Sequence, residues 1–253
     1  MKIDSKNIPF SRNDIKRKIK IPKRLEEDLS ELIGIIMGDG NIYMKNNRYE
    51  LQITGDMNED SGYHKEHINS LIKKAFNLKP KIIEKGNFRR LVLKSKAIVS
   101  FLVNTLKLCN GKKNLKIPDY IFNSNHKIKR KFLRGLADTD FTIKFKTRYG
   151  NKNYYPIVIG NFNSEEFSRE LKLLLESIGF HSHIEKRRKY DKIRNKIYLS
   201  YAINIVGKKN FKKWMESIGF SNKKHLIRYK VWSKLGYCPP YTNISKGRIL
   251  LKK

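Results

Sequence analysis

Two aspartates, each closing an apolar stretch, are the residues of this sequence with the clearest potential for chemistry. Asp39 ends the run in "LIGIIMGDGNIY" (Leu32 to Tyr43), and Asp140 ends a partial echo, "FLRGLADTDF" (Phe132 to Phe141). The C-terminal end of a helix exposes carbonyl groups and has negative dipole character. Two carboxylates meeting there repel each other unless a proton or a cation is shared. Carboxylates, carbonyls and waters together supply the octahedral oxygen coordination that Mg²⁺ requires.

Two helices must position these acids, and the sequence predicts them from about Pro22 to Gly38 and from about His126 to Thr139. Small residues four positions apart share a helix face and allow close backbone approach. Such pairs occur on both helices: Gly34, Gly38, Gly135 and Thr139. Helix packing through them would set Asp39 and Asp140 near each other, where a bound divalent ion can activate water and stabilise the leaving oxygen of a phosphodiester. Taken alone, Asp39 is better explained as a turn residue, because Asp-Gly is common in turns; the metal hypothesis rests on the pair.

Composition points to a polyanionic partner. The 253 residues include 56 Lys and Arg against 23 Asp and Glu, a net charge of +33. Nucleic acid fits best because each neutralised phosphate releases a counterion, and an anionic membrane surface is the second choice. No stretch approaches the roughly 18 apolar residues of a membrane span, and the basic N-terminus lacks a signal-peptide core. The two cysteines, Cys109 and Cys238, form no CxxC pair, which predicts a reducing cytoplasm. With nucleic acid as the partner, we expect a location near the nucleoid.

The chain contains what reads as the same unit twice, in the order αββαββα. Each unit opens with one of the acid-ending helices and continues through an alternating segment, an amphipathic helix, a strand pair and a short helix with a basic loop. We therefore expect a basic arm (1–21), a first unit (22–125), a second unit (126–236) and a basic tail (237–253). An unrelated α+β protein could show a similar series, but it would not place both acids at matched positions.

Several predicted strands alternate between a polar and an apolar face, as in Arg48–Thr54 and Lys196–Ile205. For one strand an ordinary solvated face is an adequate explanation, whereas several such strands in so basic a chain favour a nucleic-acid surface. The candidate binding residues on these faces are Arg48, Gln52, Arg90, Lys94, Arg187, Lys196, Tyr198, Ser200 and Asn204.

At the two acid motifs the sequence resembles the LAGLIDADG homing endonucleases in their two-motif, single-chain form, of archaeal type. "LIGIIMGDG" (Leu32 to Gly40) and "LRGLADTDF" (Leu133 to Phe141) match the nine-residue motif position by position. The resemblance implies a pseudo-twofold saddle of two four-stranded antiparallel sheets whose polar faces lie in the DNA major groove. It also implies a monomer that cuts both strands of double-stranded DNA at a long site.

The same resemblance assigns roles at the site. It implies that Asp39 and Asp140 bind Mg²⁺ or Mn²⁺ and that the backbone carbonyls of Gly38 and Thr139 are further ligands. Two basic loops match the place where family members supply an active-site base, and a cation there would stabilise developing phosphate charge. Their lysines are Lys112, Lys113, Lys223 and Lys224. Plain phosphate contact is the alternative for either lysine of each pair.

Two departures from the family pattern predict weakened cutting, nicking of one strand or loss of cutting. The final motif glycine is replaced by Phe141, which would not easily adopt the left-handed conformation of a helix-ending glycine. Relatives often place Gln, Asn or Lys just after the first strand of each unit, where this chain has Gly55-Asp56 and Asn161-Phe162. The sequence shows no intein-type nucleophile or terminal His-Asn, so we expect a free-standing, intron-encoded protein.

Two other functions compete with the endonuclease. A weakened relative could act as an intron-RNA maturase or as a DNA-binding protein that does not cut, and a ribosome-associated basic protein would explain the charge but not the paired acids.

Among weaker signals, we expect His64 and His67 to be solvated or to face DNA, and Trp214 and Trp232 to fill the core.

Overall fold

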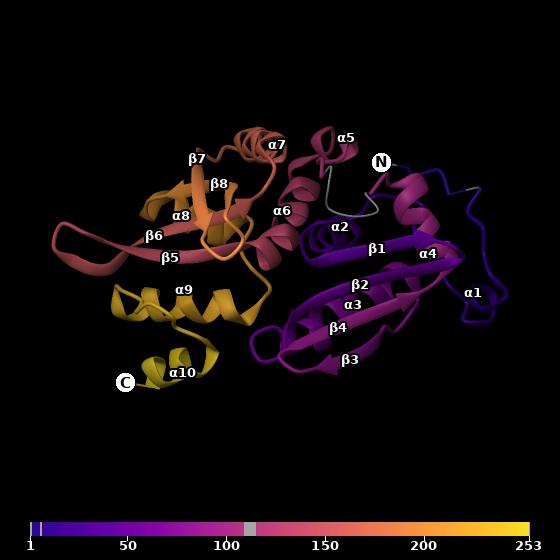
Figure 1. Ribbon diagram of the computed structural model, residues 1–253, viewed down its shortest axis with the longest axis horizontal. Helices are drawn as coiled ribbons and strands as arrows, with labels where there is room; N and C mark the ends of the chain where they lie inside the picture. The colour runs from indigo at the N-terminus through magenta and orange to yellow at the C-terminus, as the bar shows by residue number, and fades with distance from the viewer. Residues whose placement is uncertain (1, 6, 109–114, 253) are drawn as a thin grey trace. The chain divides into compact units, whose positions relative to one another are not determined.

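The computed structural model describes residues 2–5, 7–108 and 115–252, and the first repeat has the expected order of elements (Figure 1). Helix α2 is followed by the hairpin β1–β2, a helical segment, the hairpin β3–β4 and a second helical segment. The bounds are α2 (Glu27–Asp39), β1 (Gly40–Lys45), β2 (Arg48–Asp56), the π-helical η1 (Tyr63–Ile68), α3 (Asn69–Phe76), β3 (Lys81–Lys85), β4 (Phe88–Lys94), α4 (Lys96–Ser100) and the π-helical η2 (Phe101–Thr105). A short helix, α1 (Arg12–Lys16), precedes them.

The second repeat has the same order after a short α5 (Asp119–Phe122). Its elements are α6 (His126–Asp140), β5 (Phe141–Arg148), β6 (Asn151–Phe162), α7 (Glu165–Glu176), β7 (His183–Asp191), β8 (Lys196–Val206) and α8 (Lys208–Ser217). Helices α9 (Lys223–Leu235) and α10 (Ile244–Lys252) follow. The predicted α+β architecture is confirmed: two four-stranded antiparallel sheets form, in the orders β1-β2-β4-β3 and β5-β6-β8-β7.

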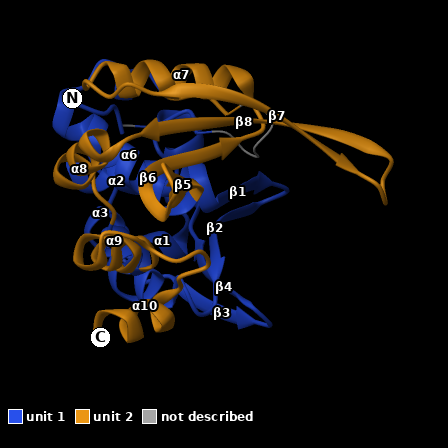
Figure 2. Ribbon diagram, turned by 90° about the vertical axis from the view of Figure 1, so that its left-hand side faces the viewer, with its two compact units in different colours: residues 1–114, 118–139, 221–223 blue, residues 115–117, 140–220, 224–253 orange. Residues whose placement is uncertain are grey.

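The chain divides into two compact units that do not coincide with the repeats (Figure 2). Unit 1 holds residues 1–114, 118–139 and 221–223, and unit 2 holds residues 115–117, 140–220 and 224–253. Almost all of α6, the opening helix of the second repeat, therefore packs within unit 1. So does the short segment Ser221–Lys223 that enters α9.

In unit 1 the apolar face of the first sheet is buried along its two central strands, β2 and β4. Leu51, Ile53 and Leu91 are 0% exposed, and α2 and α4 both contact β2. Helix α2 begins at Glu27, so the expected start near Pro22 was wrong. The residues before it are extended instead, because Ile3 N donates to Lys23 O and Lys2 bridges to Arg24.

In unit 2 aromatic side chains fill the space under the second sheet. Trp214 is 0% and Trp232 7% exposed, which confirms that both tryptophans belong to the core, and the Trp232 indole donates to Tyr154 O at 2.7 Å. The β7–β8 hairpin runs beyond the body of this unit (Figure 2), which leaves Ile193 and Ile197 largely exposed. Within the described part of the chain, no helix has the length and apolar character needed to cross a membrane.

Candidate functional site

Helices α2 and α6 pack against each other inside unit 1 through two glycines, as the residue spacing predicted. A Cβ atom at Gly34 would lie 2.2 Å from the carbonyl oxygen of Phe132, and one at Gly135 would lie 2.0 Å from that of Glu31. Real Cβ atoms do not approach backbone so closely, so only glycine allows this separation of the two helix axes. The two glycines form the centre of the helix contact.

Each helix ends on its motif aspartate five positions after that glycine. Asp39 and Asp140 are both half-buried, while Gly38 is buried and Thr139 half-buried. The Thr139 hydroxyl donates to Leu136 O at 2.8 Å, so this side chain turns back onto its own helix. The assignment of these four residues as metal ligands remains a prediction.

The structure corrects the expectation that Phe141 distorts the second motif. Gly40, its counterpart, has φ −79° and ψ 148°, so its backbone is extended and not left-handed; glycine is required there by space, since a Cβ atom would approach the carbonyl oxygen of Ile36. Gly40 pairs with Ile53, whereas Phe141 pairs with Gly160, and a Cβ atom on Gly160 would lie 2.8 Å from the Phe141 ring. The small and large residues have therefore exchanged strands. Phe141 is accommodated by the glycine opposite it, not by an unusual backbone.

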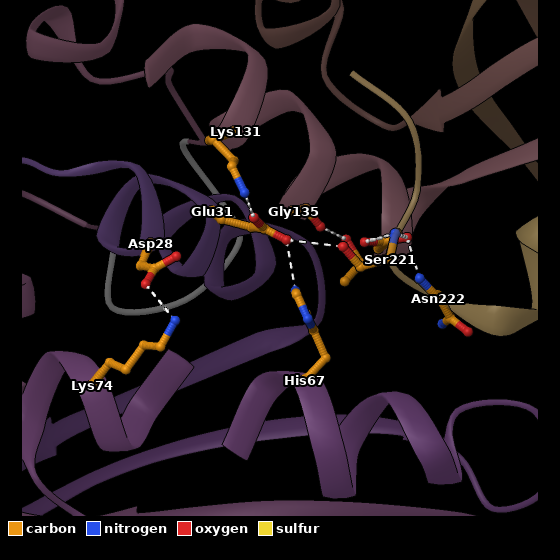
Figure 3. Close-up of polar contacts among 10 residues, drawn as sticks. Asp28, Glu31, His67, Lys74, Lys131, Gly135, Ser221 and Asn222 are labelled. Atoms are coloured by element: carbon orange, nitrogen blue, oxygen red, sulfur yellow. Dashed lines mark hydrogen bonds and ion pairs between the residues drawn. The ribbon is translucent and has the colours of Figure 1, made fainter. Parts of the chain in front are cut away.

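A fully buried carboxylate, Glu31, lies beside the glycine contact (Figure 3). His67 Nε2 lies 2.7 Å from Glu31 Oε1, Lys131 Nζ lies 3.0 Å from Oε2, and the Ser221 hydroxyl donates to Oε1 at 3.1 Å. Burial alone would raise the pKa of Glu31, but the hydrogen bonds from His67 and Lys131 outweigh it and lower that pKa to about 2. Glu31 is therefore an ionised, fully partnered anchor that ties η1, α6 and the 221–223 segment to α2.

A second buried carboxylate, Asp138, holds the segment that leads into α9. Its oxygens accept the backbone N–H groups of Ser221 at 3.0 Å and Asn222 at 2.9 Å (Figure 3). Burial raises the pKa of Asp138 to about 7, an effect that the two N–H groups partly oppose. The Asn222 side chain in turn donates to Asp60 Oδ1 at 2.6 Å. Two buried acids, Asp138 and Asp60, thus hold the two residues immediately before Lys223.

The histidine expectation was wrong. His64 is 1% exposed and lies under β2, where a Cβ atom on Gly55 would meet its ring at 2.7 Å. His67 is the ion-pair partner of Glu31 and stacks on Tyr63 with ring centroids 5.4 Å apart. Sequence reasoning also missed Glu31 and Asp138. A carboxylate inside an apolar helical stretch was the available signal for both.

Of the candidate lysines, Lys112 and Lys113 lie outside the described residues. Lys223 and Lys224 open α9. Lys223 is exposed and its Nζ lies 2.9 Å from Glu66 Oε2, whereas Lys224 is half-buried. The site roles of these lysines remain predictions.

On the first sheet the candidate DNA-binding side chains already have partners within the protein. Exposed Arg48 donates to Glu50 at 3.1 Å, buried Gln52 also donates to Glu50, and Arg90 donates to the Thr54 hydroxyl at 3.3 Å. Lys94 is exposed, with its Nζ 3.9 Å from Glu50. The polar face is therefore an organised network in which Gln52 is not open to solvent.

The second sheet shows the same mixture. Arg187 donates to Glu185 at 2.8 Å and to Asn161 at 3.2 Å, and Asn204 is only 3% exposed, with its amide donating to Ala202 O. The remaining candidates line β8, where two are exposed and one is half-buried: Lys196, Tyr198 and Ser200.

The Gly55-Asp56 position carries no side chain suited to catalysis. Asp56 Oδ1 accepts the N–H groups of Asn58 and Glu59, both at 2.8 Å, so this carboxylate caps a turn. Gly55 has no room for a side chain above His64 and Asp60. Among the residues that the structure describes, no three or more His, Cys, Asp or Glu side chains are grouped to hold a metal ion. A metal held by either motif aspartate would therefore need carbonyl, water or phosphate oxygens in addition.

Comparison with known proteins identifies a shared domain. Residues 127–219 match the model of the LAGLIDADG-like domain. Curated relatives include the glutamine–fructose-6-phosphate aminotransferase of Methanocaldococcus jannaschii, 29% identical over 81% of this chain and 17% of that protein. The replication factor C small subunit of the same organism is 31% identical over 77% of this chain and 11% of that protein. An A-type ATP synthase protein of Pyrococcus horikoshii is 27% identical over 87% and 20%. The chain thus spans a fifth or less of each.

Solved structures agree on the fold. The homing endonuclease I-DmoI, in complex with DNA and Mn, superimposes with a TM-score of 0.52 at 18% identity, covering 78% of this chain and 98% of I-DmoI. The homing endonuclease I-WcaI, bound to its DNA recognition sequence, gives a TM-score of 0.52 at 21% identity over 82% and 87%. The N-terminal LAGLIDADG domain of WhiA gives 0.50 at 17% identity over 83% and 92%.

Proposed function

Because the chain carries a LAGLIDADG-like domain and has the LAGLIDADG homing endonuclease fold, we propose that it is a site-specific double-strand DNA endonuclease. It hydrolyses phosphodiester bonds at a long target site as a monomer. The helix pair is the observation that carries this proposal. Helices α2 and α6 touch at matched glycines, and each ends five positions later on an aspartate.

The donor set suits a hard divalent cation, Mg²⁺ or Mn²⁺. Asp39 and Asp140 supply carboxylate oxygens, and Gly38 and Thr139 supply backbone carbonyl oxygens at helix ends of negative dipole character. A bound divalent ion lowers the pKa of a coordinated water and stabilises charge on the leaving oxygen. I-DmoI has been crystallised with DNA and either Mn or Ca, which supports divalent metal use in this fold.

The first turn of α9, where the sequence predicted a basic loop, carries the lysines that supply the remaining chemistry. Lys223 and Lys224 would stabilise the developing charge of the phosphate or orient the attacking water, and Lys112 and Lys113 have the corresponding place in the first half. Asp138 and Glu31 support Lys223 and Lys224, because the residues leading into α9 are hydrogen-bonded to both acids. The start of α9 is therefore held in place before DNA binds.

The polar faces of the two sheets would bind the duplex. Antiparallel strands can read base edges in the major groove, and the nine polar-face candidates mix cations with amide and hydroxyl groups. The net charge of +33 provides the sequence-independent attraction to phosphates. Gln52 and Asn204, which are buried in the structure, would have to leave their internal partners to contact a base.

The relatives favour a mobile endonuclease over any of their named activities. An aminotransferase, a component of a replication factor and a component of an ATP synthase share no activity by name, and each matches this chain over a fifth or less of its length. A segment common to unrelated proteins is best explained as one that moves between genes. Location of this gene within an intron would identify the insertion site as the candidate target.

Cleavage of a randomised plasmid library tests the proposal. With Mg²⁺ we expect linear product from members that contain the target. Asp39→Asn and Asp140→Asn should each lower cleavage by a factor on the order of 1,000 or more, while affinity for the uncut target is retained. Asp28→Asn is the control, because Asp28 lies on the same helix and pairs at the surface with Lys74. Intact DNA in every pool, with folded protein and Mg²⁺ or Mn²⁺, would refute the proposal.

A second candidate is a relative that binds nucleic acid without cutting, as an intron-RNA maturase or a DNA-binding protein. Gly55-Asp56 favours it, because this position offers only a turn-capping carboxylate where relatives often have Gln, Asn or Lys. Preferential binding of structured intron RNA over duplex DNA, together with uncut library DNA, would support this candidate over the endonuclease.

A further inference from the structure

The N-terminal segment is built into unit 1 around one buried carboxylate. Asp14 is 0% exposed, its Oδ2 accepts the Ser11 backbone N–H at 3.0 Å and the Ala97 N–H at 3.1 Å, and its Oδ1 lies 3.0 Å from the Arg17 guanidinium. Arg17 also donates to Lys94 O at 2.7 Å. These bonds join α1 to the end of β4 and the start of α4, so the residues of α1 have fixed positions against the first sheet.

A cavity of about 550 Å³ opens where α1 meets this sheet, and cationic side chains dominate its lining. Arg17 comes from the N-terminal segment, Arg48 from the start of β2, and Lys94 and Lys96 from the end of β4 and the start of α4. The one carboxylate in the lining, Glu50, is already engaged by Arg48 and Lys94. Ser11, Asn13 and Asn47 add neutral hydrogen-bonding groups. With Arg17 paired to Asp14 and Glu50 engaged by two other cations, four cations face two carboxylates, and this excess of positive charge suits an anionic ligand.

The cavity continues the polar face of the first sheet. Arg48, Glu50 and Lys94 lie on that face, whereas Leu51 and Leu93 point into the core. Figure 1 shows α1 beside the end of the sheet to which β4 runs. A duplex lying along the polar face would therefore bring its backbone toward this cavity.

We propose that α1 and the adjoining end of the first sheet form a binding site for backbone phosphates of duplex DNA, outside the base pairs read by the sheet. The inference rests on the proposed function and adds a site to it. Strand β1 separates this end from the motif, and five residues at about 3.3 Å each span roughly 17 Å from Gly40 to Lys45. One DNA strand advances about 3.4 Å per nucleotide, so the phosphates bound here lie roughly five nucleotides outward from the bond nearest Asp39.

The test uses a double variant of two pocket residues that hold no other element in place. Asn13→Asp puts a carboxylate into the cavity, and an acid in the first turn of α1 is favourable for the helix. Lys96→Gln removes a cation that lies near the Tyr49 ring. The matched control, Lys65→Gln with Lys73→Gln, makes the same change in net charge on exposed positions of η1 and α3.

Binding to a duplex of about 30 base pairs of arbitrary sequence is measured over a range of salt concentrations. We expect the slope of log K against log salt to fall by roughly 1 to 2 for the pocket variant, with affinity lowered on the order of tenfold, and to stay unchanged for the control. Urea denaturation verifies that both variants are folded. Equal slopes for the two variants would overturn the phosphate site and leave DNA binding standing. No duplex binding by the unaltered protein would instead refute the proposed function.

Discussion

The two motif helices are alike at their contact and opposite at the buried positions around it. Gly34 and Gly135 occupy matched places and meet the facing backbone in the same way. Glu31, however, corresponds to Phe132, which is fully buried and apolar. Farther along, Met37 in the first helix corresponds to the buried Asp138 in the second.

Each half thus contributes one buried acid where the other half has an apolar side chain, and the two acids have different partners. Glu31 is held by side chains, His67, Lys131 and Ser221, whereas Asp138 accepts backbone N–H groups. A contact between two copies of α2 would place Met37 where two N–H groups need a carboxylate. Unpaired buried donors are costly, so the chemistry favours pairing α2 with α6 over pairing either helix with its own copy.

The ends of the motifs differ in the same complementary way. In the first half glycine begins the strand and Ile53 faces it, whereas in the second half Phe141 begins the strand and Gly160 faces it. Exchange of volume across a strand pair conserves packing, which cores tolerate well. The missing motif glycine is therefore a repacked position, and the end of α6 at Asp140 does not require a left-handed residue after it.

The largest effect we expect comes from removing the exchanged side chain. Phe141 is 3% exposed and its ring lies 5.8 Å from those of both Phe162 and Trp214. Phe141→Ala should lower the free energy of unfolding by about 4 kcal/mol, because the cavity adds to the lost transfer free energy. Urea denaturation measures this loss.

The effect of Gly160→Val on stability should change sign when Phe141 is removed, which tests whether the two residues compensate for each other in volume. Gly160→Val alone should be destabilising, because its Cβ would lie 2.8 Å from the rings of both Phe141 and Phe162. In the Phe141→Ala background the Phe162 ring can move into the vacated space, so the valine should restore part of the loss by filling the cavity. A double-mutant cycle measures this coupling. Additive effects would show that Phe141 and Gly160 are not a compensating pair.

The next largest effect on stability concerns the glycine contact between α2 and α6, to which both halves contribute alike. Gly34→Ala and Gly135→Ala should each cost about 3 kcal/mol or more, since the new methyl group meets backbone that cannot move away without separating the helices. The two losses should be similar. Gly62→Ala is the control: this glycine has helical φ −66° and ψ −39°, and its Cβ would make only ordinary contacts with the side chains of Lys223 and Glu66, at 3.5 Å or more. A stabilisation of about 0.5 to 1 kcal/mol is expected there. Tolerance of alanine at either contact glycine would contradict the helix packing.

Sequence reasoning was most successful where the physical signal was local and periodic. The strand and helix order follows from alternation and helical spacing. The small residues four positions apart on each helix, beginning at Gly34 and at Gly135, predicted the helix contact that the structure shows. Those patterns need no knowledge of which segments meet.

The features that were missed depend on pairings between distant residues. Whether Glu31 can be buried depends on His67, Lys131 and Ser221, which lie on three other segments. The fit of Phe141 depends on a strand register that puts Gly160 opposite it. Neither can be read from spacing along the chain, and a motif comparison alone made Phe141 look like a defect.

A smaller effect, confined to acid pH, tests the side-chain anchor. The pKa of Glu31 falls from about 4.5 to about 2 on folding, so its ionised form stabilises the protein above pH 4.5, and this contribution is lost as the pH falls toward 2. The stability advantage of the protein over its Glu31→Gln variant should shrink by about 2 to 3 kcal/mol over that window. Urea denaturation at several pH values gives the difference. Asp28→Asn, at an exposed ion pair, should show little such dependence.

The smallest effect comes from a comparison of an exposed ion pair with a buried hydrogen bond at the start of α9. The Lys223–Glu66 pair joins the second half to η1, but its side chains are 55% and 67% exposed, so Glu66→Gln should change the free energy of unfolding by no more than about 0.5 kcal/mol. Asn222→Ala, at the residue preceding Lys223, is the comparison, and it should cost roughly 2 kcal/mol, because it removes a buried hydrogen bond to the Asp60 carboxylate. Comparable losses from the two variants would mean that the exposed pair contributes as much to stability as the buried hydrogen bond to Asp60.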